Sequence, residues 1–163
     1  DFTSNIDSTY DSYVFKFINI HPATNGTFFQ FNMSVDGGSN YNVTKTTTSF
    51  YAYHTESGSA SALTYDTGQD LAQGTGFQNL LYAISSDNDS AGSGELTIFN
   101  PSSTTFVKHF LATSNTAATS PYTINFRYGG YGNTTSAVNA IQFKMNSGNI
   151  DAGTIKLYGI KDS

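Results

Sequence analysis

Side chains capable of acid–base or metal chemistry are few in this chain and lie far apart. The three histidines are His21, His54 and His109, and no pair of them has the close spacing of a simple zinc site. His54 and Glu56 lie two residues apart, so on a strand they would share one face as a weak acid–base pair. A polar strand end explains the same spacing equally well, and we expect no metal site.

Carboxylates and nucleophiles are also poorly placed for catalysis. Glycoside hydrolysis needs two carboxylates that flank the scissile bond, and the only glutamates are Glu56 and Glu95, while most aspartates occur in turn-like segments. The chain has no cysteine and no Gly-x-Ser-x-Gly motif. We therefore predict that the protein is not an enzyme and has neither catalytic residues nor a cofactor. The alternative is a hydrolase that uses Glu56 or Glu95.

The segment Asp87-Asn88-Asp89 carries oxygen ligands of the kind that Ca²⁺ prefers. The glycine and the downstream glutamate of an EF-hand loop are misplaced around it. A solvated turn is the simpler interpretation, and calcium binding at Asp87 and Asp89 remains the alternative.

Candidate binding residues gather in one glycine-rich stretch. Its members are aromatic, amide or guanidinium side chains, namely Tyr122, Arg127, Tyr128, Tyr131 and Asn133. The glycines at 129, 130 and 132 predict a flexible loop that exposes the tyrosines. Such a set can stack on a sugar and form hydrogen bonds with it, or it can pack against a neighbouring subunit. We predict a ligand- or partner-binding face here.

The composition predicts a neutral, polar surface. Charged residues make up only 12% of the 163 residues, about half the usual share in soluble proteins, whereas aromatic residues reach 15%. The net charge is −5 and Arg127 is the only arginine, which argues against nucleic-acid binding. No apolar run approaches the ~18 residues of a membrane span. Because the sequence opens on Asp1, we expect a processed or trimmed chain.

The clearest element that must position these residues is a strand over 27–35. Phe29, Phe31, Met33 and Val35 alternate with Gln30, Asn32 and Ser34, and this period of two places one face on a core and the other in water. The same alternation predicts that a second set, Ile141, Phe143 and Met145, points into the same core. Asp36-Gly37-Gly38 then ends the strand in a tight turn.

Further short strands are predicted on both sides of it, over residues 13–20, 49–54, 77–84, 95–100, 105–112, 122–128, 138–145 and 154–160. Residues 13–20 are apolar on nearly both faces, so we expect this strand to be covered on two sides and to pair with 27–35 across the Asn25-Gly26 turn. Residues 95–100 and 105–112 should form a hairpin. Four lysines inside strands, Lys16, Lys108, Lys144 and Lys156, should mark solvent faces.

Eight or nine short strands, with at most one helical turn at 70–73, predict an all-β fold. We expect a single antiparallel β-sandwich of jelly-roll type over residues 13–163, preceded by a weakly structured polar arm over 1–12.

Three parts of the sequence resemble a known group of proteins. They are His21–Gly26, then Asn100–Thr105 with Val107–Phe110, and then Asn133–Ala137 through the ending Gly153–Ile160. Together they are similar to small virion-associated proteins of marine tailed phages, including phages of cyanobacteria, and the similarity covers most of the chain. The resemblance implies a virion structural or decoration role and carries over no catalytic or binding residue.

Two functions of different classes follow. In the first, the chain is a non-catalytic component of a phage particle surface, as capsid decoration or fibre head. It would be a homo-oligomer that contacts other virion proteins and a host glycan. In the second, it is a lectin-like carbohydrate-binding module of a tail fibre or of a secreted protein. Neither function involves nucleic acid or membrane insertion.

Overall fold

A computed structural model describes residues 1–161 as ten antiparallel strands without a helix. The strands are β1 (Ser12–Pro22), β2 (Thr27–Ser34), β3 (Lys45–Thr55), β4 (Ser61–Tyr65), β5 (Gln78–Ile84), β6 (Gly92–Phe99), β7 (Lys108–Ala117), β8 (Tyr122–Gly132), β9 (Ala140–Met145) and β10 (Ile150–Ile160). They form two sheets, a seven-stranded sheet in the order β10-β1-β6-β7-β8-β3-β4 and a three-stranded sheet in the order β5-β2-β9. The predicted all-β sandwich is confirmed, and its jelly-roll type remains a prediction.

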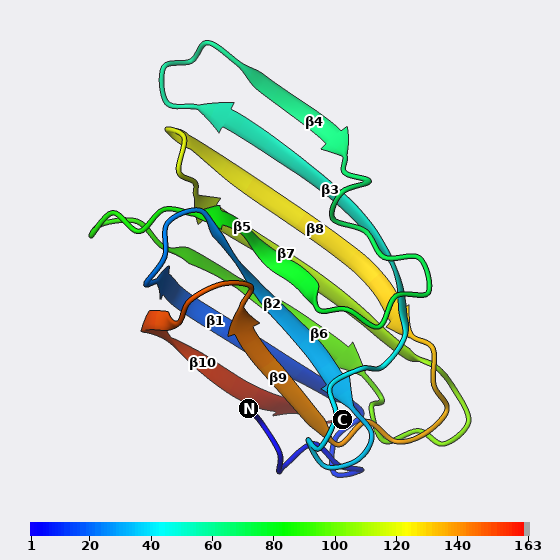
Figure 1. The fold of residues 1–163 in the computed structure, drawn as a ribbon. Helices are drawn as coiled ribbons and strands as arrows, with labels where there is room; N and C mark the ends of the chain where they lie inside the picture. Colours follow the sequence, from blue (N-terminus) through cyan, green and yellow to red (C-terminus); the bar gives the residue numbers. More distant parts are fainter. Residues whose placement is uncertain (162–163) are drawn as a thin grey trace.

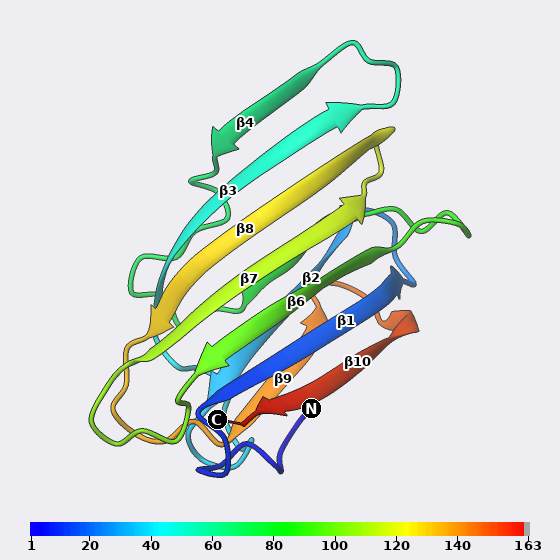
Figure 2. The same cartoon turned by 180° about the vertical axis from the view of Figure 1, so that it is seen from behind.

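The two sheets differ in width, and this difference shapes the molecule (Figure 1). The small sheet lies against one face of the large one, and its edge strand β5 contacts β6, β7 and β8. Strands β3 and β4 project beyond that edge, as the view from behind also shows (Figure 2). Part of the inner face of the large sheet therefore has no partner layer.

The core lies between the sheets and is largely aromatic. The six residues predicted to share it, Phe29, Phe31, Met33, Ile141, Phe143 and Met145, are all at most 7% exposed, so this prediction is confirmed. Phe29 stacks on Phe143 with ring centroids 5.6 Å apart, and Phe31 meets Phe110 of the large sheet edge-on at 5.1 Å. The predicted hairpin of β6 and β7 is also confirmed.

The predicted pairing of the first two strands is wrong. β1 pairs with β10 and β6 in the large sheet, whereas β2 pairs with β5 and β9 in the small one. Each strand has one apolar face, and the two faces are opposed across the core, where Phe17 and Phe29 lie 5.3 Å apart. β1 is also covered on one side only, because Lys16 and Ile18 on its other face are exposed.

The first residues are more ordered than the polar sequence suggested. Phe2 forms a bridge with Ile141, and its ring packs edge-on against Phe15 and Phe143. Ile6 is buried as well. These two apolar side chains hold the segment before β1 against the open end of the core.

The prediction for Lys108 is wrong, since it is fully buried, whereas Lys16, Lys144 and Lys156 are exposed as expected. The Nζ atom of Lys108 donates hydrogen bonds to the carbonyl oxygens of Phe106 (2.6 Å) and Thr134 (3.3 Å). A polar strand residue can therefore point inward where backbone carbonyls gather at a sheet end.

Lys45 is a second buried lysine, and it lies across β8 from Lys108, since Gly132 of β8 pairs with Lys45 on one side and with Lys108 on the other. Its Nζ atom donates to Asn32 Oδ1 (2.5 Å) and to the carbonyl oxygen of Val43 (2.8 Å). Among residues 1–161 no carboxylate pairs with either amine. Burial therefore lowers the pKa of Lys45 to about 7 and also lowers that of Lys108.

The region between β3 and β5 differs from the sequence expectation. The short strand β4 was not predicted, and 70–73 forms no helical turn. Instead Leu71 exchanges hydrogen bonds with Thr47, and Gly74 forms a bridge with Lys45, so this segment runs along the edge of β3 that β4 leaves open.

Replacement of Phe31 by alanine should lower the free energy of unfolding by about 3–5 kcal/mol, because the ring is fully buried and the cavity cannot collapse between two sheets. Urea denaturation measures this change. Phe106→Ala is the control, because that side chain is 69% exposed. Equal effects of the two substitutions would contradict the assigned core.

Stability should rise with pH between pH 7 and 9 through Lys45. An unfolded lysine keeps its proton up to about pH 10.4, whereas the buried amine loses it above its pKa of about 7. The unfolded state therefore binds more protons in this window, and the free energy of unfolding rises by up to about 1.4 kcal/mol per pH unit.

Urea denaturation at pH 7, 8 and 9 tests this, with Lys45→Met as the variant that should lack this contribution to the slope. Lys156→Met, at an exposed position of β10, should keep it. Parallel pH profiles for the wild type and Lys45→Met would show that the amine does not titrate in this way.

Candidate functional site: a tyrosine-lined groove

A groove of about 350 Å³ opens where the large sheet projects beyond β5. Its lining is mostly aromatic and comes from β3, β5, β8 and the segments around β4. The residues are Tyr51, Tyr53, Thr55, Ala60, Asp66, Tyr82, Tyr122 and Ile124. The four tyrosines are half-buried, so each presents part of its ring to solvent.

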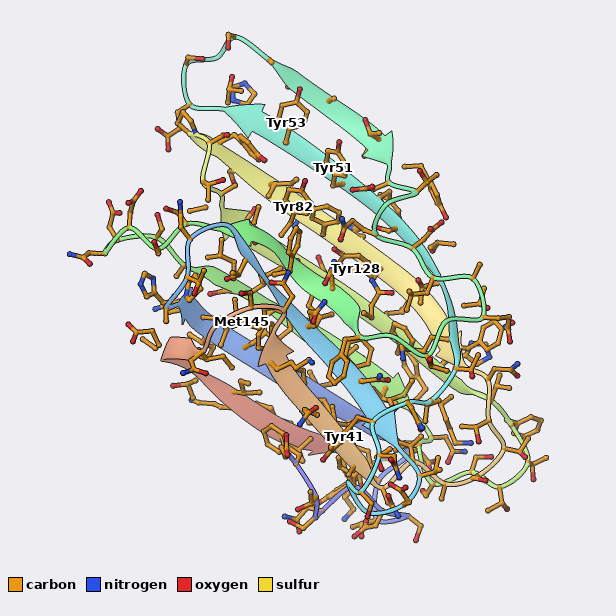
Figure 3. The ribbon with its side chains drawn as sticks, viewed as in Figure 1. Tyr41, Tyr51, Tyr53, Tyr82, Tyr128 and Met145 are labelled. Atoms are coloured by element: carbon orange, nitrogen blue, oxygen red, sulfur yellow. The ribbon has the colours of Figure 1, made fainter. Side chains whose placement is uncertain are left out.

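Strand alternation places three of the four rings. Tyr51 and Tyr53 lie two residues apart on β3 and point to the inner face of the large sheet. Tyr122 begins β8 on the same face, and its ring lies 5.7 Å from that of Tyr53. Tyr51 and Tyr53 are 6.2 Å apart. Figure 3 shows Tyr53 and Tyr51 along β3, with Tyr82 of β5 near them.

A β-bulge places the fourth ring. Between two paired positions, β2 advances from Thr27 to Phe29 while β5 advances from Leu81 to Ile84, so β5 contains one extra residue. Ala83, at this bulge, has φ 44°, a left-handed conformation that is unfavourable for a residue other than glycine. Bulges redirect side chains near binding sites. Here the bulge lies next to Tyr82, which lines the groove. The ring of Tyr82 lies 5.4 Å from that of Phe126.

The floor of the groove is a rigid aromatic stack. Phe126 lies 5.0 Å from Tyr51, and it stacks on Tyr128 with centroids 5.3 Å apart and planes at 4°. Tyr128 is only 2% exposed, and burial strongly raises its pKa. The four half-buried tyrosines therefore pack against buried aromatic rings and do not extend from loops.

Polar groups in the groove are neutral hydroxyls and one carboxylate. Within residues 1–161 the four tyrosine hydroxyls form no hydrogen bond to protein, so they are available to a ligand. Burial, followed by the neighbouring tyrosines, raises the pKa of Tyr122. The carboxylate is that of Asp66, whose Oδ1 accepts a hydrogen bond from the backbone of Gly68 at 2.9 Å. The lining thus combines flat apolar faces with hydroxyl donors and acceptors.

The acid–base pair considered from sequence lies at the rim. His54 and Glu56 are both exposed and line a neighbouring hollow of about 240 Å³, which shares Tyr122 with the groove. Glu95, the other glutamate, lies on the opposite face of the large sheet, where Lys16 Nζ is 4.0 Å from its carboxylate. The groove lining itself contains a single carboxylate.

The five residues predicted as one binding face are not brought together. Tyr122 lines the groove and Tyr128 is buried beneath it. Arg127 projects from the other face of β8 into a hollow of about 410 Å³, and Tyr131, on that same face, lies 6.0 Å from His109. Asn133 follows the strand and donates to Gln73 Oε1 at 2.8 Å.

The predicted flexible loop is also wrong, because β8 continues through its glycines to Gly132. These glycines permit close packing instead. A Cβ atom on Gly130 would come within 2.6 Å of the carbonyl oxygen of Thr46 and of the side chain of Thr47. Alternation therefore continues along the strand and sends neighbouring side chains to opposite faces.

Sequence reasoning missed Tyr51, Tyr53, Asp66 and Tyr82. The spacing of Tyr51 and Tyr53 within an expected strand was a usable signal, because it places both rings on one face. No comparable pattern in the sequence marks Tyr82, which lines the groove next to the β-bulge at Ala83.

The Asp87–Asp89 turn lies between β5 and β6, and Asp89 lines a surface hollow with His21 and Asp151. The Nδ1 atom of His21 is 2.7 Å from the carbonyl oxygen of Ser90. Within the described residues no group of three or more His, Cys, Asp or Glu side chains is arranged to hold a metal ion. The same part of the chain contains no helix long and apolar enough to cross a bilayer.

Comparisons of this chain with protein-family models, with curated proteins and with solved structures find no match.

Proposed function

We propose that the protein is a non-catalytic binding protein and that its tyrosine-lined groove binds a carbohydrate. The observation that carries this proposal is the set of four half-buried tyrosines, held on a packed aromatic floor, whose hydroxyls have no hydrogen-bond partner among residues 1–161. Sugar rings have apolar faces edged by hydroxyl groups. An aromatic face and a nearby phenol satisfy both features at once.

The charge and size of the groove narrow the ligand class. Asp66 is the only charged residue in the lining, so an acidic sugar would be repelled and a neutral one would not. A volume of about 350 Å³ lies near the lower end of the range for ligand pockets, ~300–1,000 Å³. We therefore propose a short stretch of a neutral glycan as the ligand.

The absence of a paired carboxylate supports binding rather than hydrolysis. Retaining and inverting glycosidases use two carboxyl groups ~5–9.5 Å apart. Asp66 has no second carboxylate beside it in the lining, and Glu56 occupies the neighbouring hollow.

We further propose that the groove acts on the surface of a phage particle, with the chain present in many copies. Support comes from the resemblance of the sequence to virion proteins of marine tailed phages. A surface poor in charged residues also requires little desolvation on contact with a glycan or another protein. The alternative is a lectin-like module of a tail fibre or of a secreted protein, and the composition of purified particles distinguishes the two.

Substitution in the groove should weaken glycan binding. Tyr53→Ala and Tyr82→Ala should each reduce affinity for a neutral glycan by roughly tenfold, because an aromatic contact contributes about 0.5–1.5 kcal/mol beyond its area. A glycan array identifies the ligand, and titration calorimetry measures the change.

Tyr158→Ala is the matched control, because this tyrosine is 44% exposed on β10, outside the groove. Failure of every neutral glycan to bind would contradict the proposal, as would equal losses for Tyr53→Ala and Tyr158→Ala. Cleavage of a bound glycan that disappears in Glu56→Gln or Glu95→Gln would contradict the non-catalytic part.

Deletion of the protein from the phage should leave DNA content and genome packaging unchanged while altering particle stability or adsorption to the host. Mass spectrometry of purified particles, quantitative adsorption assays and DNA quantification measure these effects. Purified particles that contain none of the chain would refute the location, even if the isolated protein binds a glycan.

A further inference from the structure

The outer face of the large sheet, turned toward the viewer in Figure 2, lies on the side away from the small sheet. No other strand of the described chain covers it. Most of the exposed large apolar side chains lie on this face, among them Phe50, Leu63, Leu111 and Tyr158, which are 40–74% exposed. Such a concentration is unusual for a surface that remains in water.

Charged residues on this face form an ordered row across the strands. The pairing register places one residue of each successive strand side by side, in the order Lys156, Lys16, Glu95, Thr113, Arg127 and Phe50. Glu95 and Arg127 each lie one strand away from Thr113, at ~4.8 Å per strand. Thr113 belongs to β7, which has three strands on either side in the sheet.

We propose that this face binds a second copy of the chain through a two-fold axis that runs parallel to β7 above Thr113. That rotation exchanges the two sides of the row, so Glu95 of each copy lies opposite Arg127 of the other. It also brings Lys16 opposite Phe50, an arrangement that permits a cation–π contact. The row is thus complementary to its own reversed copy, as an isologous interface requires.

The charge pattern excludes the other simple face-to-face arrangement. An axis perpendicular to the strands would place Glu95 opposite Glu95 and Arg127 opposite Arg127, and like charges in contact are strongly unfavourable. Within residues 1–161 the guanidinium of Arg127 forms no ion pair or hydrogen bond. It is therefore free to bind the carboxylate of Glu95 in the second copy.

The neighbouring row of residues, which contains Leu111, is complementary in shape between the two copies as well. Leu111 lies on β7 between Thr97 of β6 and Gly129 of β8. Because Gly129 lacks a side chain, a hollow of about 410 Å³ forms above it, bordered by Phe50, Leu111 and Arg127. The same axis directs Thr97 of one copy toward the hollow of the other and brings the two Leu111 side chains together.

The face is large enough for a stable dimer. Six strand spacings span ~29 Å, and strands of ten or eleven residues are ~33 Å long, whereas a standard interface buries ~800 Å² per partner. Sheets that pack face to face cross at about 30°. The contacts near the axis, Thr113 and the pair of Glu95 with Arg127, are displaced least by that angle.

Charge exchange tests the proposal on the full chain by sedimentation equilibrium. The wild type should be a dimer. Glu95→Arg and Arg127→Glu should each weaken association by at least about tenfold, because each places like charges in contact twice per dimer. An equimolar mixture of these two variants should associate again, since each Arg then faces a Glu. Asp89→Arg, in the exposed turn between β5 and β6, is the matched control and should remain dimeric.

Thr113→Arg provides a second variant, since it places two positive charges against each other on the axis without altering either ion-pair residue. Circular dichroism checks that each variant is folded. A wild type that stays monomeric at 100 μM overturns the proposal. So does a dimer that survives Glu95→Arg and Thr113→Arg, or a mixture of the two charge variants that stays monomeric.

Discussion

Contact between two layers of phenylalanine rings holds this fold together. Phe29, Phe31 and Phe143 from the small sheet meet Phe15, Phe17 and Phe110 from the large one, all at most 7% exposed. The chain has no disulfide, and among residues 1–161 only one ion pair, between exposed side chains, is formed. Burial of these rings, together with the aliphatic side chains packed around them, is therefore the main favourable contribution to folding.

The unequal width of the sheets explains why the same packing also produces a site. Three strands cannot cover seven, so β3 and β4 extend beyond the small sheet. Tyrosine suits such a position, because its ring packs on the neighbouring aromatics while its hydroxyl reaches water. The groove is thus the continuation of the core to the surface, and its rings are positioned by the interactions that stabilise the fold.

Local patterns predicted the centre of the core and every strand except β4, but not the relations between layers. Alternation in 27–35 and 141–145 identified the six core residues correctly, because that period is a property of a single strand. It was wrong for Val35, which is 38% exposed, and for Asn32 and Ser34, which are buried on the face expected in water. Whether residues 13–20 pair with 27–35 or face them across the core depends on partners distant in sequence, such as β10. The glycines at 129, 130 and 132 favoured a loop, yet close packing against β3 and β7 keeps them in a strand. Because the strand continues through these glycines and its side chains alternate between faces, Tyr122 is the one residue of the five predicted site residues that lines the groove.

Buried and exposed lysines of this protein differ in their reactivity toward acylating reagents. Lys45 has a lowered pKa, so much of its amine is in the nucleophilic form near neutral pH, yet no reagent can reach it in the closed sandwich. Exposed lysines such as Lys156 are accessible to reagents at all times. Acylation at Lys45 would therefore proceed only when the end of the sandwich near Gly132 opens. Its rate would report how often that part of the molecule separates while the rest stays folded.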